Sequence, residues 1–242
     1  LRKELLLDEL VFNTESDTEV ILNGFIKYGH DYFKKLRGFF SFCIFDHKNQ
    51  SLILSRDQFG KKPLYYSVIN SEFIFSSEIM PIVGSLERKT NPEYEGLSHF
   101  LWKGHYAHGY SAFSDIKSIL PGEILIYNIT EKKIKKIQTK EKIVLDVKNL
   151  NCSRSIKELK ESLIESLRYR FVSDVPVSFL LSGGVDSTLL SVLSKKYLNK
   201  EFQTFYMGYD NNNDIFRNIA KRVSDSNDLP HHSITMADLE IS

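Results

Sequence analysis

Six consecutive residues combine small, hydroxyl and acidic side chains in a way that suits phosphate binding. They are Ser182, Gly183, Gly184, Val185, Asp186 and Ser187, called here the SGGVDS loop. A glycine has no Cβ, so an anion can approach the main chain closely. If a helix follows, its first N–H groups point at the same place, and the two serine hydroxyls add further donors. The sequence therefore predicts a loop that binds the phosphates of a nucleotide.

The SGGVDS loop differs from two widespread phosphate-binding patterns. It lacks G-x-x-x-x-G-K-[ST], so transfer of a γ-phosphoryl group is not the expected reaction. Its spacing does not fit G-x-G-x-x-G, which argues against a dinucleotide ligand. The structural alternative is a tight strand-to-helix turn with Asp186 as the helix N-cap. A bare Gly-Gly pair would favour that alternative, whereas the full pattern after an apolar strand favours phosphate binding.

The elements around the loop alternate between strand and helix. Strands are predicted over residues 175–181, 202–208 and 232–236, and helices over residues 155–168, 186–197 and 213–223. This order is typical of a doubly wound parallel α/β sheet. The ligand crevice of such a sheet lies at the carboxyl ends of the strands, where the SGGVDS loop begins.

The first half of the chain shows a different period. A helix is predicted over residues 16–29, where Ser16 and Glu19 have the spacing of a capping box. Strands are predicted over residues 39–45, 51–55, 64–69, 72–76 and 123–128. Short strands with short connections favour an antiparallel sheet, and the continuous apolar run at 39–45 predicts a strand covered on both faces. The basic run at 131–142 is interpreted as a solvated edge strand or a linker, because acidic residues are interleaved in it.

The composition is that of an ordinary globular protein. Hydrophobic residues make up 42% and the formal net charge is +1, so neither nucleic acid nor an anionic membrane is an expected partner. Two cysteines are too few for a disulfide framework. The sequence shows no signal peptide and no apolar run of membrane-spanning length. We expect a cytoplasmic protein with two domains, residues 1–145 and 150–242.

Longer segments extend these motifs in both halves of the chain. The segment SDVPVSFLLSGGVDSTLLS covers residues 173–191, and SDTEVI, LRGFFSFCIFD, RDQFGKKPLYY and FSSEI lie within residues 16–79. These segments resemble the glutamine-hydrolysing asparagine synthetase family. The resemblance implies that the first domain is the C-terminal part of a glutaminase domain (glutamine amidotransferase type 2), a partial antiparallel sandwich of the N-terminal-nucleophile-hydrolase type. The second would be the N-terminal part of an asparagine synthetase-type ATP-pyrophosphatase domain.

The resemblance implies ATP-dependent amidation of a carboxylic acid. In this family the carboxylate attacks the α-phosphate of ATP to give an acyl-adenylate and pyrophosphate, and ammonia from glutamine then displaces AMP. Aspartate is the first acid implied, ATP and Mg²⁺ are the implied cofactors, and a homodimer is compatible with the resemblance. The residues implied for ATP and pyrophosphate are Leu180, Ser182, Gly183, Gly184, Asp186, Ser187 and Met207, with Asp186 also directed at Mg²⁺.

Three further positions carry a functional and a structural interpretation. Asp17 falls where the family grips the α-amino group of glutamine, and a carboxylate suits an ammonium ligand. Alternatively, Ser16 and Asp17 only cap the following helix. Met207 has a comparable alternative as an ordinary core residue at a strand end. Arg56 and Asp57 are interpreted as a salt-bridged turn rather than as support for an active site.

The glutaminases of this family use a cysteine as their first residue, with its own amino group as the base. Here Leu1 stands first, Cys43 lies in an apolar strand and Cys152 lies in a predicted linker. The resemblance therefore implies that no catalytic residue is present in this chain. We expect a fragment that is inactive by itself, with the activity belonging to the parent protein.

Three functions stay open at this point. The first is asparagine synthesis. The second is the same chemistry on another carboxylate, such as a sugar acid in surface polysaccharide synthesis or closure of a β-lactam ring, because the middle of the chain resembles the family only loosely. The third is a non-catalytic module that retains the fold. Outside these motifs, Trp102 is expected in the core, and His231-His232 is interpreted as structural because it lacks partners at metal-ligand spacing.

Overall fold

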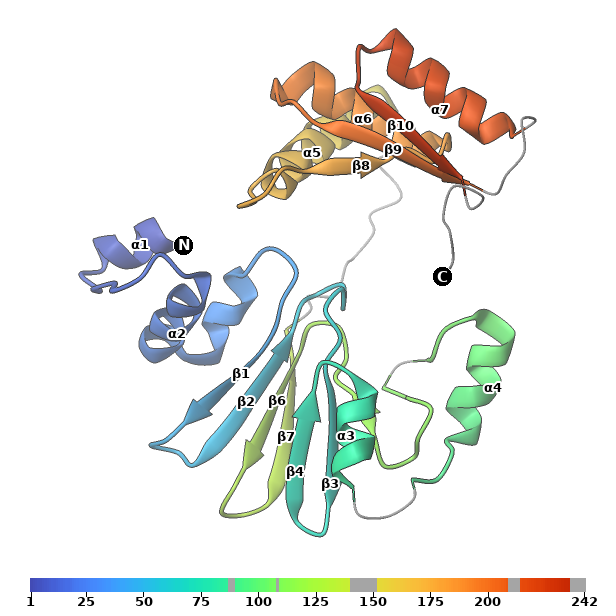
Figure 1. Ribbon diagram of the computed structural model, residues 1–242. Helices are drawn as coiled ribbons and strands as arrows, with labels where there is room; N and C mark the ends of the chain where they lie inside the picture. Colours follow the sequence, from blue (N-terminus) through green and yellow to red (C-terminus); the bar gives the residue numbers. More distant parts are fainter. Residues whose placement is uncertain (87–89, 108, 140–151, 209–213, 236–242) are drawn as a thin grey trace. The chain divides into compact units, whose positions relative to one another are not determined.

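The computed structural model describes residues 1–86, 90–107, 109–139, 152–208 and 214–235, and the chain divides into two compact units (Figure 1). The first unit is Leu1–Ile143 and the second is Val144–Ser242. The domain boundary expected between residues 145 and 150 lies outside the described residues. No described helix combines the length and the apolar character needed to cross a membrane.

The first unit is built from antiparallel sheets and short helices. Its helices are α1 (Arg2–Leu7), α2 (Asp17–Tyr28), the 3-10 helix η1 (Gly29–Lys35), α3 (Ile79–Ser85) and α4 (Tyr94–Lys103). Its strands are β1 (Ser41–Asp46), β2 (Ser51–Arg56), β3 (Tyr65–Ile69), β4 (Glu72–Ser76), β5 (Lys117–Ser118), β6 (Glu123–Asn128) and β7 (Lys133–Gln138). One sheet has the order β1-β2-β6-β7 and the other the order β4-β3-β5.

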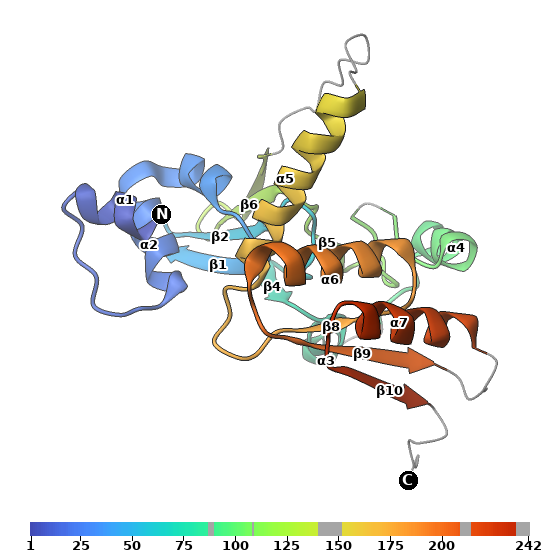
Figure 2. The ribbon, with the colours of Figure 1, turned by 90° about the horizontal axis from the view of Figure 1, so that it is seen from above.

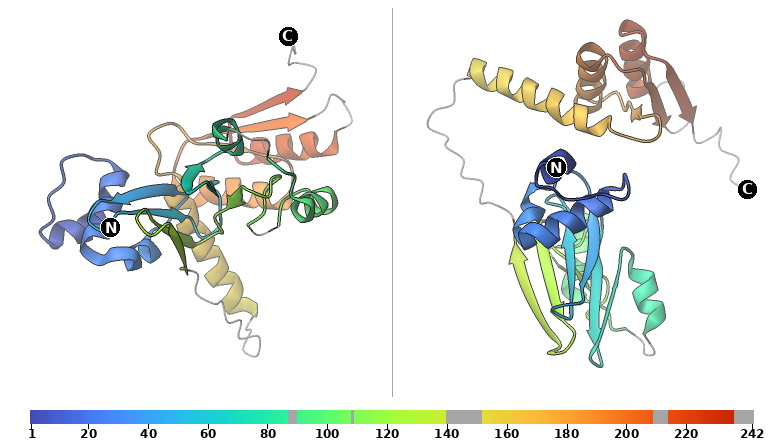
Figure 3. Two further views of the ribbon diagram at one scale, coloured as in Figure 1. Left: turned by 90° about the horizontal axis from the view of Figure 1, so that it is seen from below. Right: turned by 90° about the vertical axis from the view of Figure 1, so that its left-hand side faces the viewer.

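Successive residues of the central strands β2 and β6 face two different cores. Ile53 and Ile124 pack with α1, α2 and η1, whereas Leu54 and Leu125 pack with the second sheet. Because side chains alternate along a strand, a sheet buried on both faces needs apolar residues at consecutive positions. The first unit is therefore a sandwich of two sheets with helices against the outer face of one of them, and Figure 3 shows these helices in blue.

The two edge strands of the first sheet are less buried than its centre. In β1, Phe42 and Ile44 pack on the helices and Cys43 on the second sheet, but the side chain of Phe45 is 52% exposed. The prediction that residues 39–45 are covered on both faces is thus only partly right, because the packing on the two faces does not extend to Phe39 and Phe45. At the other edge, β7 is exposed along most of its length. This agrees with the interpretation of the basic run as a solvated edge strand.

Helix α4 carries large apolar side chains on the surface. The side chain of Trp102 is 76% exposed, and the Lys103 Nζ atom lies 3.7 Å from the centre of its ring. A cation placed over the ring face gives an exposed tryptophan a favourable partner. The expectation that Trp102 is a core residue is therefore wrong.

The second unit is a parallel α/β structure. Its elements are α5 (Cys152–Arg170), β8 (Ser178–Leu180), α6 (Val185–Leu198), β9 (Gln203–Gly208), α7 (Ile215–Ser226) and β10 (His231–Thr235). The strands are parallel in the order β10-β9-β8, with Leu180 opposite Phe205 and Ile234 opposite Met207. The fold class expected from the sequence, antiparallel sheets followed by a parallel α/β unit, is confirmed.

Two boundaries in the second unit differ from the sequence prediction. β8 covers residues 178–180 rather than 175–181, because Pro176 has no N–H to donate to a neighbouring strand. Just past β8, Leu181 still donates its N–H to the carbonyl of Phe205 at 2.7 Å. Cys152, which was expected in a linker, is the first residue of α5.

Helix α7 packs over the central strand of the second unit. Leu181, Tyr206 and Ala220 are buried together, and Val223 packs against them. These residues come from the end of β8, from β9 and from α7. Figure 2 shows α6 and α7 side by side, and residues of both helices line one shallow groove. The packing places the first turn of α7 near the carboxyl ends of the strands.

Backbone hydrogen bonds, and not a salt bridge, organise the turn after β2. The wholly buried Asp57 carboxylate accepts N–H bonds at 3.0–3.1 Å from Phe59, Lys61 and Lys62. Arg56 donates to backbone carbonyls, including that of Lys62 at 2.7 Å, and forms no ion pair with Asp57. Burial disfavours the charged carboxylate, but the N–H bonds outweigh it and hold the pKa of Asp57 below its usual value. The structural interpretation of this pair stands without the salt bridge.

Asp57→Asn should destabilise the first unit by about 1–3 kcal/mol at neutral pH, because the amide NH₂ would face N–H donors. The folded pKa of Asp57 is lowered, so its contribution is present above the unfolded value of about 4 and is lost as pH falls through the folded pKa. Urea unfolding at neutral pH and at about pH 3 should show the difference from wild type shrinking on acidification.

Asp31→Asn is the matched control for this experiment. Asp31 is an exposed carboxylate that pairs with Lys34 on the surface at 2.6 Å. Loss of this charge should leave the free energy of unfolding close to that of wild type, because solvent screens an exposed ion pair. An Asp57→Asn variant as stable as Asp31→Asn would contradict the role given to Asp57.

Candidate functional site

The SGGVDS loop connects the end of β8 to the start of α6, at the carboxyl edge of the parallel sheet. α6 begins at Val185, and its N-cap residue is Gly184, which has no side chain with which to cap the helix. The first N–H groups of an α-helix have no partner inside the helix, so those of α6 are directed toward the loop. The positive end of the helix dipole lies at the same place, and both features favour an anion.

Asp186 does not cap this helix. It is the second residue of α6, it is exposed, and its carboxylate has no hydrogen-bond or ion-pair partner among the described residues. The interpretation of Asp186 as the N-cap of a structural turn is therefore wrong, because Gly184 occupies that position. An exposed carboxylate without a protein partner is free to bind a divalent cation.

Ser182 and Ser187 close the loop on itself. Their hydroxyl oxygens lie 3.0 Å apart, and the Ser187 hydroxyl also accepts the Ser182 N–H at 3.2 Å. The Ser187 hydroxyl can donate to the Gly184 carbonyl at 3.2 Å, and the Ser182 hydroxyl accepts the Gly184 N–H at 3.4 Å. These bonds hold both hydroxyls next to the start of α6, as a site for a phosphate requires.

The two glycines of the loop differ in whether the fold needs glycine at their position. Gly183 has φ of +75°, and a Cβ there would lie 2.4 Å from the carbonyl oxygen of Phe216. Gly184 has φ of −76°, which any residue adopts, and a Cβ there would come no closer than 3.4 Å to the Ser182 hydroxyl. The fold thus requires glycine at 183 but not at 184. A bare main chain at 184 fits a ligand that approaches the backbone.

Leu180 and Met207 lie on one face of the sheet beside the loop. Leu180 is opposite Phe205, and Met207 is two residues further along β9, so their side chains point the same way. The side chains of Leu180 and Met207 are 71% and 60% exposed, so Met207 is not a core residue. Together they form an exposed apolar surface that suits a flat aromatic ring.

Asp17 is the first residue of α2 in the other unit. Ser16 is the N-cap, and its hydroxyl accepts the Thr18 N–H at 3.2 Å. The capping box is not completed, because the Glu19 carboxylate accepts N–H bonds from the segment before the helix. Asp17 is exposed and its carboxylate has no partner among the described residues. Capping therefore does not need Asp17, which leaves it free for an ammonium ligand.

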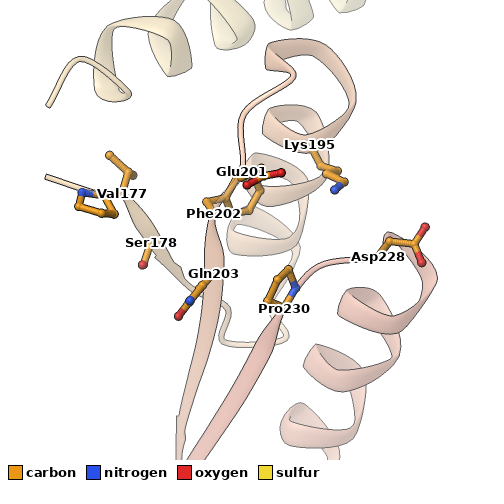
Figure 4. Close-up of a pocket in the computed structure, with 9 residues that line it drawn as sticks. Val177, Ser178, Lys195, Glu201, Phe202, Gln203, Asp228 and Pro230 are labelled. Carbon is orange, nitrogen blue, oxygen red and sulfur yellow. The ribbon is translucent and has the colours of Figure 1, made fainter.

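A cavity of about 650 Å³ opens at the opposite edge of the parallel sheet (Figure 4). Its lining includes Val177, Ser178, Phe202, Gln203 and Pro230. These residues lie at or just before the amino ends of the strands, whereas the SGGVDS loop follows a carboxyl end. None of the predicted site residues lines this cavity.

The His231 ring bonds within the sheet. Its Nδ1 atom lies 2.9 Å from the hydroxyl of the buried Thr204, which also lies 3.0 Å from the Pro230 carbonyl. In the parts of the chain that the structure describes, no group of three or more His, Cys, Asp or Glu side chains is placed to hold a metal. The bond of His231 to Thr204 is consistent with a structural interpretation of this histidine.

The first turn of α7 lies against Gly183 and was not among the predicted site elements. A signal was present, because Asp214 stands just before the apolar-periodic segment and aspartate is a preferred N-cap residue. The contact between the first turn of α7 and the SGGVDS loop depends on tertiary packing. No local sequence pattern predicts it.

Comparison with known proteins places the two halves in two families. The glutamine amidotransferase domain family matches residues 1–139, and the asparagine synthase family matches residues 158–241. The chain belongs to the glutamine-hydrolysing asparagine synthetase family.

Several known proteins are similar to most of the chain. Glutamine-hydrolysing asparagine synthetase 3 of Bacillus subtilis is 30% identical over 93% of this chain and 37% of its own length. Glutamine-hydrolysing asparagine synthetase 1 of the same organism is 29% identical over 87% of this chain and 33% of its own length. The amidase chry2 of Gibberella zeae is 31% identical over 77% of this chain and 27% of its own length. The chain therefore spans less than two fifths of the length of these relatives.

In this synthetase-family chain, Gly183→Ala should destabilise the second unit by roughly 1–3 kcal/mol, because alanine is strained at positive φ and its Cβ would meet the α7 backbone. Gly184→Ala is the matched control and should change the free energy of unfolding by less than about 1 kcal/mol. Calorimetric unfolding of both variants measures the difference. Equal stability would show that the contact between the loop and α7 is not tight.

Proposed function

We propose that the whole protein catalyses ATP- and glutamine-dependent amidation of a carboxylic acid, and that the SGGVDS loop binds the pyrophosphate part of ATP. The observation that carries the proposal is the uncapped N-terminus of α6 beside the exposed, unpaired Asp186 in a chain of this family. Because the chain spans less than two fifths of the named relatives, the proposal concerns the whole protein.

The SGGVDS loop offers donors where negative charge would collect. The N–H groups at the start of α6 and the hydroxyls of Ser182 and Ser187 would face the β- and γ-phosphates. When the carboxylate of the acid attacks the α-phosphorus, the bond to the bridging oxygen breaks and pyrophosphate leaves with the additional negative charge. Donors that are already fixed in place stabilise that charge without reorganisation.

Asp186 is the residue that we assign to Mg²⁺ in this site. Its carboxylate is exposed and unpaired among the described residues, and oxygen ligands suit this ion. When bound there, Mg²⁺ would supply positive charge that offsets the charge of the pyrophosphate. Leu180 and Met207 are assigned to the two sides of the adenine ring, because both are apolar and exposed on one face of the sheet.

Glutamine is assigned to the first unit, where Asp17 would hold its α-ammonium group through a charge-assisted contact. Ammonia released from the glutamine side chain would attack the acyl carbon of the acyl-adenylate. AMP then leaves and the amide forms. The free carboxylate of Asp17 at the start of α2 supports this assignment.

Cys43 is not proposed as the nucleophile for glutamine hydrolysis. Burial raises the pKa of its thiol to about 11, although a backbone hydrogen bond from Ile53 acts in the opposite direction. A thiol with that pKa is almost fully protonated at neutral pH and reacts poorly. Cys152 lies on α5 in the other unit. We therefore propose that these 242 residues alone do not hydrolyse glutamine.

Aspartate is the acceptor that we favour, because relatives named as asparagine synthetases match up to 93% of the chain. Another carboxylic acid is the second candidate, and the similarity to the amidase chry2 favours it. Pyrophosphate release from ATP by the whole protein, measured with each acid in turn, distinguishes them. Release with aspartate supports the first, release only with another acid supports the second, and no release with any acid would indicate a non-catalytic module.

Asp17→Asn in the whole protein should weaken the use of glutamine and leave ammonia-dependent synthesis nearly unchanged. The lost charge-assisted contact is worth about 1.5–3 kcal/mol, so KM for glutamine should rise roughly 10- to 150-fold. Initial rates with glutamine and with an ammonium salt measure this. Ser16→Ala is the control, because it removes the cap of α2 and keeps the carboxylate. A parallel fall of both activities would make Asp17 a folding residue.

Asp186→Asn in the whole protein should abolish acyl-adenylate formation with either nitrogen source, because a neutral amide is a poor ligand for Mg²⁺. The free energy of unfolding should stay within about 1 kcal/mol of wild type, since Asp186 loses only its favourable interaction with the helix dipole. Glutamine hydrolysis should continue as the internal control. Thermal unfolding and pyrophosphate release on the same preparation test the prediction, and normal release would remove Asp186 from the site.

A further inference from the structure

The backbone of Gly183 lies against the first turn of α7. A Cβ at Gly183 would lie 2.4 Å from the carbonyl oxygen of Phe216 and 3.1 Å from its Cα. Phe216 is the second residue of α7. The position of the SGGVDS loop therefore depends on where α7 begins.

Asp214 holds the start of α7 in two ways. One carboxylate oxygen accepts the N–H groups of Phe216 at 3.0 Å and Arg217 at 3.2 Å, and so caps the helix. The other oxygen accepts a hydrogen bond from the Tyr206 hydroxyl. Tyr206 is buried in β9, the central strand of the described parallel sheet. The first turn of α7 is thus tied to the sheet as well as capped.

Gly208 leaves room for this tie at the end of β9. A Cβ at Gly208 would lie 2.5 Å from Tyr206 Cε1 and 3.0 Å from Asp214 Oδ2. The hydrogen bond between the pair raises the pKa of the Tyr206 hydroxyl and lowers the pKa of the Asp214 carboxyl, so they remain a phenol and a carboxylate over the neutral range. Both carboxylate oxygens already have protein donors, which directs Asp214 to α7 rather than to a ligand.

The two helices that meet at the loop differ at their N-termini. α7 is capped by Asp214, so its first N–H groups already have an acceptor, whereas α6 has no capping side chain. An anion at the loop would therefore take its donors from α6. The contribution of α7 is instead its contact with Gly183, which supports the turn of the loop.

We propose that Tyr206 and Asp214 are positioning residues for the SGGVDS loop. By holding the first turn of α7 against Gly183, they set the direction in which the loop presents its N–H groups and hydroxyls. The inference rests on the proposed function where it concerns pyrophosphate affinity. Its geometric part concerns the loop alone and can be tested without a ligand.

The test uses the 242-residue chain and two nearly isosteric variants. Tyr206→Phe removes the hydroxyl that holds Asp214. Thr204→Val is the matched control, because Thr204 is a buried residue on the same strand whose hydroxyl bonds Pro230 and His231 near the amino end. Both variants lose buried hydroxyl hydrogen bonds, but only Tyr206→Phe alters the support of the loop.

Amide hydrogen exchange of Ser182 and Gly184 is the first measurement, because these two loop amides donate to hydroxyls within the loop. Their exchange should accelerate on the order of tenfold in Tyr206→Phe, the equivalent of one lost hydrogen bond, and stay at the wild-type rate in Thr204→Val. Asp214→Asn should stay near wild type, because its amide oxygen can cap α7 while its NH₂ group donates to the Tyr206 hydroxyl oxygen, whereas Asp214→Ala loses both contacts and should match Tyr206→Phe. If Tyr206→Phe does not fold, the comparison of Asp214→Asn with Asp214→Ala tests the proposal instead.

Calorimetric titration with magnesium pyrophosphate is the second measurement. The affinity for magnesium pyrophosphate should fall about three- to tenfold in Tyr206→Phe and Asp214→Ala. It should stay at the wild-type value in Thr204→Val. Unchanged loop exchange in Tyr206→Phe and Asp214→Ala, or equal acceleration in Thr204→Val, overturns the positioning role. If the wild-type chain binds no magnesium pyrophosphate, the proposed function fails at this loop, while loop exchange that responds as expected still upholds the positioning role.

Discussion

The candidate site depends on the turn at Gly183, where the chain passes from β8 into α6 with a positive φ and lies against the backbone of α7. Glycine alone meets both conditions without strain, since any Cβ would meet the carbonyl of Phe216. Because the turn is made by main chain and the N-cap is Gly184, no side chain covers the first N–H groups of α6. The loop hydroxyls and the exposed carboxylate of Asp186 then lie around an open helix terminus. The donors and the acid that phosphate chemistry needs follow from this one turn.

Backbone N–H groups at a turn are paired within the protein in the first unit, whereas those at the start of α6 in the second unit have no capping side chain. In the turn after β2, the buried carboxylate of Asp57 accepts the N–H groups of the turn, and Arg56 donates to its carbonyls. The N–H groups of Phe59, Lys61 and Lys62 are already bonded to Asp57, so this turn has a structural role even though its sequence carries part of the family resemblance. In the SGGVDS loop the N–H groups of α6 stay open and Asp186 stays exposed. Whether a turn is structural or binds a ligand is decided by which of its polar groups the fold has already paired.

Local patterns predicted the positions of elements where neighbouring residues decide the conformation. β4 and β6 begin and end at the residues expected from alternation and turn chemistry, and the Ser16 cap starts α2 where the polar-to-apolar transition indicates. Expectations failed where contacts with distant elements decide. Phe45 is half exposed because the packing that covers Phe42, Cys43 and Ile44 does not extend to it, and Trp102 lies at the surface beside Lys103 instead of in a core.

By itself, the sequence determined the local features on which the proposed chemistry rests: a glycine-rich turn between an apolar strand and a helix, within a chain that changes from hairpin spacing to strand-helix alternation. Those signals are local, because periodicity and backbone freedom are properties of consecutive residues. Only the tertiary structure decided that Gly184 rather than Asp186 is the N-cap, that Leu180 and Met207 share an exposed face, and that Tyr206 and Asp214 stand behind the loop. The physical reason is that strand pairing and helix packing set these relations between residues distant in the chain, and no short pattern records which partner a side chain meets.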